Sequence, residues 1–271
     1  MTEPAYGRLR AVSAHTGVVL ARNPSPMTLE GTNTWVLRHP GAPDAVVIDP
    51  GPHDEDHLRA VRAAAGTVAV ILLTHGHPDH SDGAARLHEL TGADVRSLDP
   101  TFRFGPHGLH DGDVVHAAGL DVRVLATPGH TADSLSFVLD PDTAADADTA
   151  GVSRTVLTGD TILGRGTTVV AEPDGDLAHY LASLHRLRAL GDTTMVLPGH
   201  GPELPNAGSV AAHYLAHREQ RLAQIRAALD ELGPHASARQ IVQLVYADVD
   251  EAVWWAAEMS VRAQLKYLKS H

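Results

Sequence analysis

Three histidines and two aspartates crowd into the stretch LLTHGHPDHSDG, residues 72–83, directly after an apolar run. His75 and His77 are two residues apart at a predicted strand end, so both side chains project to one side and can bind one metal ion. Pro78 cannot extend the strand and forces a turn. Asp79 and His80 then begin a helical turn and face a neighbouring point. This spacing suits two adjacent metal ions better than one.

The same arrangement, a short β-branched run followed by a Gly or Pro turn, recurs at four other places and delivers Asp49, His130, Asp160 and His200. Such runs are typical of buried strands, and the active sites of α/β folds lie at strand ends. A catalytic zinc ion typically takes three protein ligands and leaves one position for water. The alternative is a set of helix caps and hydrogen-bonded loop histidines. It is disfavoured when seven candidate ligands share this placement: His75, His77, Asp79, His80, His130, Asp160 and His200.

Two further histidines, His213 and His217, are spaced to chelate a metal because they lie four residues apart on a predicted helix. The sequence offers no third ligand beside them. We therefore expect exposed helix histidines at these two positions rather than a metal site.

The composition limits the metal chemistry and the partners. The chain has 271 residues, no cysteine and a formal net charge of −12. Disulfides, iron–sulfur clusters and thiolate zinc sites are excluded, and His and carboxylate ligands suit zinc, iron or manganese. The negative charge argues against duplex DNA as a partner. No apolar run resembles a secretion signal or approaches the length of a membrane span, which predicts a soluble, cytoplasmic protein without a membrane partner.

The elements that must position these residues are strands mixed with helices, which predicts an α/β sandwich. Residues 177–187 carry apolar side chains on one helical face, and Asp176 is placed to cap that helix. Asp54 to Ala65 is a weaker helix candidate. The Ala/Asp/Thr tract at residues 140–154 lies between two strands and is predicted to be a long hairpin loop.

After His200 the pattern changes to helices. A long helix is predicted over residues 207–231, Ser237 is the expected cap of a second helix, and a third closes the chain. We expect two domains, 1–205 and 206–271, the second a small helical appendage. Helix–turn–helix geometry is plausible there, but the last helix is not followed by a wing hairpin. Lys/Arg and Asp/Glu are balanced in this region, which favours packing or dimerisation over DNA recognition.

The motifs THGHPDH, TPGHT, TGDT and LPGHG resemble the metallo-β-lactamase superfamily over roughly residues 10–205. The resemblance implies an αββα fold and an HxHxDH metal site. It assigns one metal to His75, His77 and His130 and a second to Asp79, His80 and His200, with Asp160 bridging and Asp49 supporting the ligands from behind. Antibiotic-hydrolysing members commonly place Cys where this chain has Asp160, and they carry a secretion signal. The chain is similar instead to the intracellular hydrolases.

A closer resemblance comes from NPSPMTLEGTNTWVL (Asn23–Leu37), GDTILGRGTT (Gly159–Thr168) and the C-terminal helices ending in SVRAQLKYL. These segments are similar to the lactamase-β-like protein 2 group, which has a winged-helix-like C-terminal appendage. Its mitochondrial member is a single-stranded RNA endonuclease. The resemblance implies a catalytic domain over 1–205 and a winged-helix-like domain over 206–271.

Together these observations predict a dinuclear zinc-dependent hydrolase that uses a metal-bound hydroxide, with iron and manganese as alternative metals. Two divalent ions, Asp79, Asp160 and one hydroxide leave a net charge of about +1, which favours a substrate whose transition state gathers negative charge. The substrate is either a single-stranded RNA phosphodiester or a small ester, thioester or lactone. Asp79 is the expected catalytic residue, placed to orient the hydroxide or carry its proton. Arg165 and Asn33 are candidate substrate contacts.

Two other functions remain as alternatives. Some superfamily members are iron-dependent oxidoreductases such as persulfide dioxygenases, but these use a single iron and do not need His80 and His200. A nucleic-acid-binding regulator acting through the C-terminal helices is disfavoured by their charge balance. Phe102 and Phe104 are expected in the core or in a dimer contact, so a homodimer is an open alternative.

Overall fold

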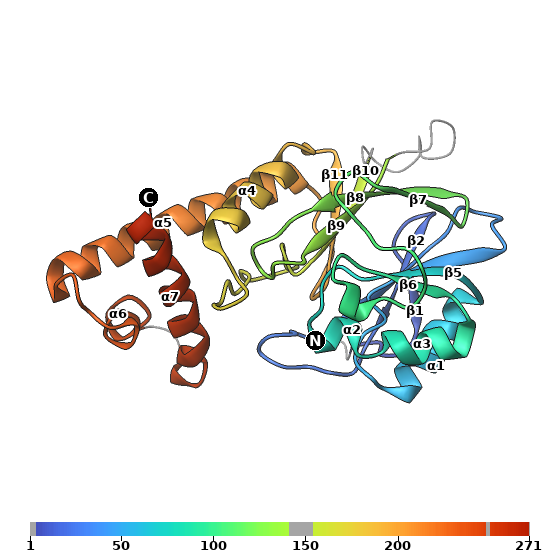
Figure 1. Ribbon diagram of the computed structural model, residues 1–271, viewed down its shortest axis with the longest axis horizontal. Helices are drawn as coiled ribbons and strands as arrows, with labels where there is room; N and C mark the ends of the chain where they lie inside the picture. The colour runs from blue at the N-terminus through green and yellow to red at the C-terminus, as the bar shows by residue number, and fades with distance from the viewer. Residues whose placement is uncertain (1–3, 141–153, 248–249, 271) are drawn as a thin grey trace.

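The computed structural model describes residues 4–140, 154–247 and 250–270 (Figure 1). The predicted hairpin loop at 140–154 lies almost entirely outside the described residues. No helix in the described ranges is both long enough and apolar enough to cross a membrane.

In the described residues, eleven strands form two sheets. The first sheet has six strands in chain order: β1 (Leu9–Ala11), β2 (Thr16–Leu20), β3 (Asn33–Leu37), β4 (Asp44–Ile48), β5 (Thr67–Leu72) and β6 (Asp94–Arg96). The second has five strands in the order β11-β10-β9-β8-β7: β7 (Val114–Ala117), β8 (Leu120–Ala126), β9 (Leu135–Leu139), β10 (Arg154–Gly159) and β11 (Thr194–Pro198). Within each sheet, adjacent strands pair antiparallel except β4–β5, β5–β6 and β10–β11, which pair parallel.

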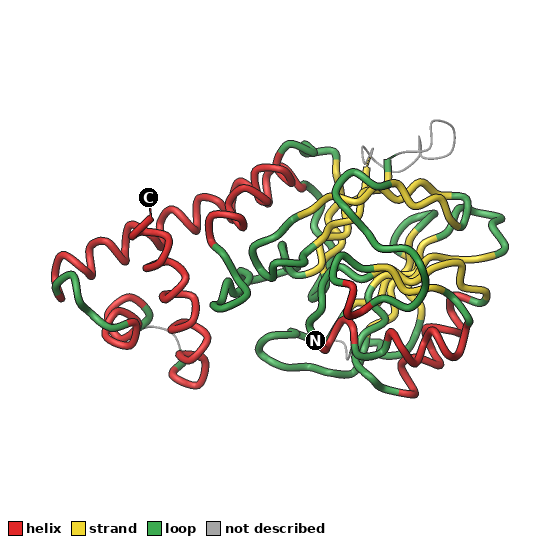
Figure 2. Tube along the Cα trace, in the orientation of Figure 1, coloured by secondary structure: helices red, strands yellow, loops and turns green. Residues whose placement is uncertain are grey.

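The two sheets pack face to face and helices cover their outer faces, which confirms the predicted αββα sandwich (Figures 1 and 2). The layer between the sheets contains Trp35, Ile48, Phe137 and Leu197, all buried. Helices α1 (Glu55–Ala65) and α3 (Ala84–Thr91) pack on the first sheet. On the second sheet pack α4 (Leu177–Arg188) and the first half of α5 (Ala207–Leu232). Short turns of helix occur at α2 (Pro78–Ser81), η1 (Pro100–Phe102) and η2 (Glu251–Val253).

Helices α1 and α4 begin at capping aspartates, Asp54 and the predicted cap Asp176. Asp54 Oδ1 accepts hydrogen bonds from the backbone N–H groups of Asp56 and His57 at the start of α1. Asp176 accepts one from the N–H of His179 at the start of α4. Each cap satisfies donors that a helix end leaves without an intrahelical partner. Both predicted helix starts are confirmed.

The C-terminal part is helical, as predicted. Helices α6 (Ala238–Val245) and α7 (Trp254–Ser270) pack against the second half of α5 through a small core that includes Ile225, Ile241, Trp254 and Val261. Ser237 forms a capping box with Gln240 at the start of α6. Because the first half of α5 belongs to the core of the sandwich and the second half to this small core, one helix joins the two parts (Figure 1). The domain boundary at 206 stays a prediction.

Candidate metal centre

Five strands deliver polar side chains to one rim of the sandwich. Strands β8 and β10 are both antiparallel to β9, and β11 is parallel to β10, so these three run in the same direction. In the other sheet β4 and β5 run parallel. Asp49 directly follows β4 and Asp160 directly follows β10, while the turns after β5, β8 and β11 carry His75, His130 and His200.

Glycines allow the turns after these strands to approach one another closely. A Cβ atom at Gly199 would lie 2.5 Å from Asp160 Oδ1 and 2.7 Å from His80 Cε1. Gly129, directly before His130, has φ of +131°, and a Cβ there would lie 2.3 Å from the backbone nitrogen of Tyr180. Any larger residue would push these side chains apart, so the glycines set the size of the site.

Three histidine rings form the first cluster. His77 Nδ1 lies 3.1 Å from His75 Nε2 and 3.1 Å from His130 Nε2. The ligand atoms of His75, His77 and His130 all lie within 4.8 Å of one another. Three imidazole nitrogens converging at such distances suit a single cation.

A second cluster of three residues lies beside the first. His200 Nε2 lies 3.2 Å from both His80 Nε2 and Asp79 Oδ2, and His80 Nε2 lies 3.4 Å from the same Asp79 oxygen. These ligand atoms also lie within 4.8 Å of one another. The helical turn of α2, which Pro78 begins, turns Asp79 and His80 toward this second point.

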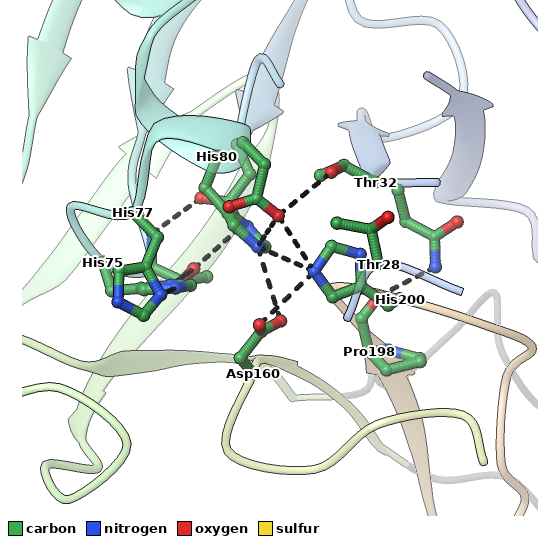
Figure 3. A network of polar contacts seen from close by, with 12 residues as sticks. Thr28, Thr32, His75, His77, His80, Asp160, Pro198 and His200 are labelled. Atoms are coloured by element: carbon green, nitrogen blue, oxygen red, sulfur yellow. Dashed lines mark hydrogen bonds and ion pairs between the residues drawn. The ribbon is translucent and has the colours of Figure 1, made fainter. Parts of the chain in front are cut away.

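Asp160 lies between the two clusters, as Figure 3 shows. Its Oδ2 is 3.3 Å from His200 Nε2 and 3.7 Å from His130 Nε2, and its Oδ1 is 3.4 Å from His80 Nε2. Oδ1 is buried and makes no hydrogen bond within the part of the chain that the structure describes. One carboxylate thus reaches ligands of both clusters.

Residues behind the clusters fix the orientation of the histidine rings. Asp49 Oδ2 accepts a hydrogen bond from His80 Nδ1 at 2.9 Å, and Thr74 donates to both oxygens of Asp49, each at 2.7 Å. The Oγ1 of Thr74 is also 3.0 Å from His75 Nδ1. These contacts leave the Nε2 atoms of His75 and His80 facing the clusters, the usual support of a metal-binding histidine.

Backbone carbonyls do the same for two other rings. His130 Nδ1 lies 2.8 Å from the carbonyl oxygen of Val169, and His200 Nδ1 lies 3.1 Å from that of Gly31. These contacts also place both Nε2 atoms toward the clusters. The segments around Gly31 and Val169 are therefore part of the site's wall.

The electrostatics differ between the clusters. Burial lowers the pKa of both His75 and His130, so these rings are held neutral, as metal ligands must be. Burial by itself would also lower the pKa of His200, but the charge of Asp160 and the hydrogen bonds to Asp160 and Asp79 together outweigh it and raise the pKa to about 9. Burial alone would raise the pKa of Asp79, but the hydrogen bond from His200 and the charges of His80 and His200 together outweigh it and lower the pKa to about 2. The carboxylates thus favour positive charge at the second cluster.

The donor set fits two divalent cations. Its ligand atoms are imidazole nitrogens and carboxylate oxygens, which suit zinc, iron and manganese. The buried Oδ1 of Asp160, which has no hydrogen-bond partner among the described residues, is an oxygen that a cation would satisfy. The structure brings together all seven side chains predicted as ligands.

The two predicted substrate contacts line a cavity of about 460 Å³ whose wall also includes Gly201, the residue after His200, but none of the seven predicted ligands. Arg165 is half exposed and pairs with Glu30, with a hydrogen bond of 2.7 Å. The side-chain amide of Asn33 donates to the carbonyl oxygens of Pro198 at 3.0 Å and of Gly201 at 2.8 Å. Asn33 therefore holds the turn that carries His200, and its contact with substrate stays a prediction.

Some residues of the site were not expected from the sequence. Thr74 lies two residues after the buried strand β5 and directly before His75, and a polar residue there is the signal that could have revealed it. Val169 contributes a backbone carbonyl, which no side-chain pattern can reveal. Of the two helix histidines, His213 is exposed as expected, whereas His217 is partly buried. Neither belongs to a group of potential metal ligands in the described part of the chain.

Comparisons with known proteins place this geometry in context. Residues 27–145 match the family model of the Metallo-beta-lactamase superfamily, and residues 237–271 match that of the Beta-lactamase associated winged helix domain. The Beta-lactamase-like protein 2 homolog of Caenorhabditis elegans is 31% identical over 263 residues, which cover 92% of this chain and 82% of that protein. The Atrochrysone carboxyl ACP thioesterase of Aspergillus fumigatus is 32% identical over 222 residues, 79% of this chain and 64% of that protein.

A solved structure supports the fold. The crystal structure of a Beta-lactamase domain protein from Burkholderia ambifaria has a TM-score of 0.77 at 24% sequence identity, and the match covers 99% of this chain and 89% of that one. This likeness includes the C-terminal helices, although the described residues after β11 form no strand.

Proposed function

Because this chain belongs to the metallo-beta-lactamase superfamily and is a metal-dependent hydrolase, we propose that it uses two zinc ions to cleave a small acyl thioester or ester. The observation that carries the two-metal proposal is the position of Asp160 between two three-residue clusters. His75, His77 and His130 would hold one ion, and Asp79, His80 and His200 the other. Asp160 would contact both.

Ions bound there would supply a hydroxide nucleophile at neutral pH and would polarise the carbonyl group of the substrate. The protein's own residues then orient the reaction. Asp79 faces His200 and His80 through Oδ2, which leaves Oδ1 to accept a hydrogen bond from the nucleophile. With a pKa of about 2, Asp79 is ionised at neutral pH and serves as an acceptor.

The proposed acyl substrate is supported by the ion pairs of the arginines near the site and by the name of one relative. A relative of this chain is named as an acyl carrier thioesterase. Single-stranded RNA, the other predicted substrate, needs several cations that contact its backbone. Arg165 is already paired with Glu30, and Arg10 at the same cavity pairs with Glu203. A small acyl substrate needs fewer such contacts, so the pairing of two of the three arginines that line this cavity favours it there.

A substrate panel tests the proposal. Zinc-loaded protein is offered acyl thioesters, esters, lactones and single-stranded RNA, beside His75→Ala and, as a matched control, the exposed surface variant His107→Ala. We expect thioester cleavage that His75→Ala abolishes and His107→Ala retains. Cleavage of RNA alone, or turnover that survives His75→Ala, contradicts the proposal.

Metal analysis separates hydrolysis from redox chemistry. Protein purified without chelator is expected to hold two equivalents of zinc per chain. One equivalent of iron, together with oxygen consumption, would favour the dioxygenase alternative instead.

A further inference from the structure

A second cavity, of about 270 Å³, lies between the catalytic part and the C-terminal helices. Its walls come from Met27, from residues 167–169, from α5 and from α7. Figure 1 shows the loops that carry Met27 and residues 167–169 on the side of the sandwich that faces α7. A ligand in this cavity could therefore contact both the sandwich and the C-terminal helices.

Arg218 of α5 is the unusual residue in this wall. Its side chain is only 4% exposed, yet the described residues offer it no carboxylate. One guanidinium nitrogen donates to the carbonyl oxygen of Thr168, and the group lies 5.1 Å from the centre of the Tyr180 ring. Its Nε is buried and has no hydrogen-bond partner among the described residues. A buried charge of this kind is costly unless an anion completes its contacts.

Two neighbours on the same helix add donors. Arg221 donates to the carbonyl oxygen of Val245 at 3.3 Å and lies 4.2 Å from the centre of the Tyr246 ring, again without a carboxylate. His217 Nδ1 is buried and has no partner in the described ranges. Burial, followed by the charges of Arg218 and Arg221, lowers the pKa of His217 to about 4, so the ring is neutral at neutral pH.

The cavity is lined by positively charged side chains, although the protein as a whole is negatively charged. The chain has a net charge of −12, but none of the described residues lining this cavity is acidic. The remaining lining is mainly small or apolar and includes Met27, Val253, Ala256 and Ala257. The cavity therefore suits a ligand with an anionic group and a short carbon segment next to it.

We propose that this cavity binds a phosphate group at the end of the substrate's thiol arm, remote from the thioester bond that is cleaved. The inference rests on the proposed thioesterase function and names its substrate class, a phosphorylated thiol carrier. Two arginine side chains present forked donors that match phosphate oxygens, and a phosphate monoester carries nearly two negative charges near pH 7. A cavity of 270 Å³ accommodates the phosphate and the adjacent carbons, while the acyl group lies at the metal centre.

The cavity and the metal centre share their walls. Val169 accepts the hydrogen bond from His130, and Thr168 Oγ1 donates to the backbone carbonyl of Asp160 at 2.7 Å. The loop that carries Met27 continues to Gly31, which accepts from His200. A linear thiol arm held between these two segments would join the phosphate site to the metal centre.

Two substrates that differ by one phosphate test the inference. Acyl-phosphopantetheine and acyl-pantetheine carry the same acyl group and the same thiol. We expect the wild type to show a KM about tenfold to a hundredfold lower for the phosphorylated substrate at similar kcat, as charge-assisted hydrogen bonds would give. Arg221→Gln should bring the two KM values together. Arg226→Gln, an exposed position on the same helix, should keep the wild-type ratio.

Binding gives a readout independent of turnover. Thioether analogues of the two substrates, which cannot be cleaved, are titrated calorimetrically into metal-loaded wild type, Arg221→Gln and Arg226→Gln, with thermal melts to verify folding. Tighter binding of the phosphorylated analogue by wild type and Arg226→Gln, but not by Arg221→Gln, supports the site. Equal affinity of the wild type for both analogues overturns it.

The same experiments separate this inference from the proposed function. If no thioester is cleaved, the proposed function fails, and the analogue titration still decides whether the cavity binds phosphate. A different outcome is that Arg221→Gln weakens the cleavage of single-stranded RNA while acyl-phosphopantetheine and acyl-pantetheine have equal KM values. In that case the cavity binds a polynucleotide and the thiol-carrier inference is wrong.

Discussion

At the scale of single residues, Asp49 is a buried carboxylate and Asp160 a mostly buried one, and the two have different surroundings. Asp160 faces ligands of both clusters, whereas Asp49 faces the back of His80 and the hydroxyl and amide of Thr74. The first is placed to contact cations and the second to orient a ligand. Substitutions at the two positions should therefore have different consequences.

Asp160→Ala should reduce the bound metal from two ions to one or none and remove hydrolytic activity. The fold should persist, because the sandwich core rests on apolar residues of the strands. Metal content by mass spectrometry, turnover and circular dichroism check the prediction. Near-normal turnover with two ions bound would refute the bridging role.

Asp49→Asn should weaken metal binding about tenfold to a hundredfold, since residues that orient ligands have effects of this size. An amide nitrogen at the Oδ2 position could not accept from His80 Nδ1, so the ring would carry its proton on Nε2, toward the cluster. Asn tolerates the positive φ of 50° at this position, so the backbone should be retained. Chelator competition measures the change, with exposed Asp230→Asn as the control. Unchanged affinity would argue against this orienting role.

At the scale of elements, a buried histidine adds polar contacts to the apolar packing of α1 on the first sheet. His57 Nε2 lies 2.9 Å from Thr34 Oγ1, which in turn donates to the carbonyl oxygen of Asp49 at 2.7 Å. Burial lowers the pKa of His57 to about 4 from its ordinary value of 6.5. The folded protein therefore excludes a proton that the unfolded chain binds.

This difference predicts a loss of stability in weak acid. Between pH 6.5 and about 4 the unfolded state binds more protons at this residue, so the free energy of unfolding falls as the pH falls. The contribution lost by pH 4 is about 3 kcal/mol. Urea unfolding of wild type and His57→Gln at several pH values should show a stability difference that narrows over this range. The exposed variant His107→Gln should show the same pH dependence of unfolding free energy as the wild type. If the unfolding free energy of His57→Gln also falls in parallel with that of the wild type, the prediction is wrong.

The elements also show what a sequence can and cannot reveal about this site. Runs such as AVVIDPG and TMVLPGH predict buried strands with a ligand at the end, because β-branched residues followed by Gly or Pro have few other structures. The caps Asp54, Asp176 and Ser237 were predictable for the same local reason. The carbonyl of Val169 and the cavity around Arg218 were not, since they depend on how distant segments pack.

At the scale of the whole molecule, α5 links the sandwich to the C-terminal helices. Ala207, Ala211, Tyr214 and Leu215 of its first half are buried in the core of the sandwich. The hydroxyl of Tyr214 also accepts from the backbone N–H of Leu163 at 3.0 Å. The helix is therefore needed to cover the second sheet as well as to carry the appendage.

A chain of residues 1–205 should accordingly fail to fold cooperatively, because it exposes the apolar face that α5 covers. A chain of residues 1–232 keeps α5 and should retain more secondary structure, with a lower melting temperature than the full chain because α7 also contributes Ala263 to that core. Size-exclusion chromatography and thermal melts of these two shorter chains and of the full chain test the prediction. A compact 1–205 fragment that melts cooperatively would establish the boundary at 206 as a folding boundary.

The wide separation of the candidate ligands along the chain has a consequence for biosynthesis. His75 and His77 leave the ribosome more than a hundred residues before His200, and the second sheet cannot close until β11 has been made. Domains fold largely as units during translation, so the nascent chain first offers only the ligands of residues 75–80, without His130, Asp160 and His200. An ion captured at that stage can still exchange. Which metal the mature protein carries is therefore decided after synthesis, by the metals available to the completed chain.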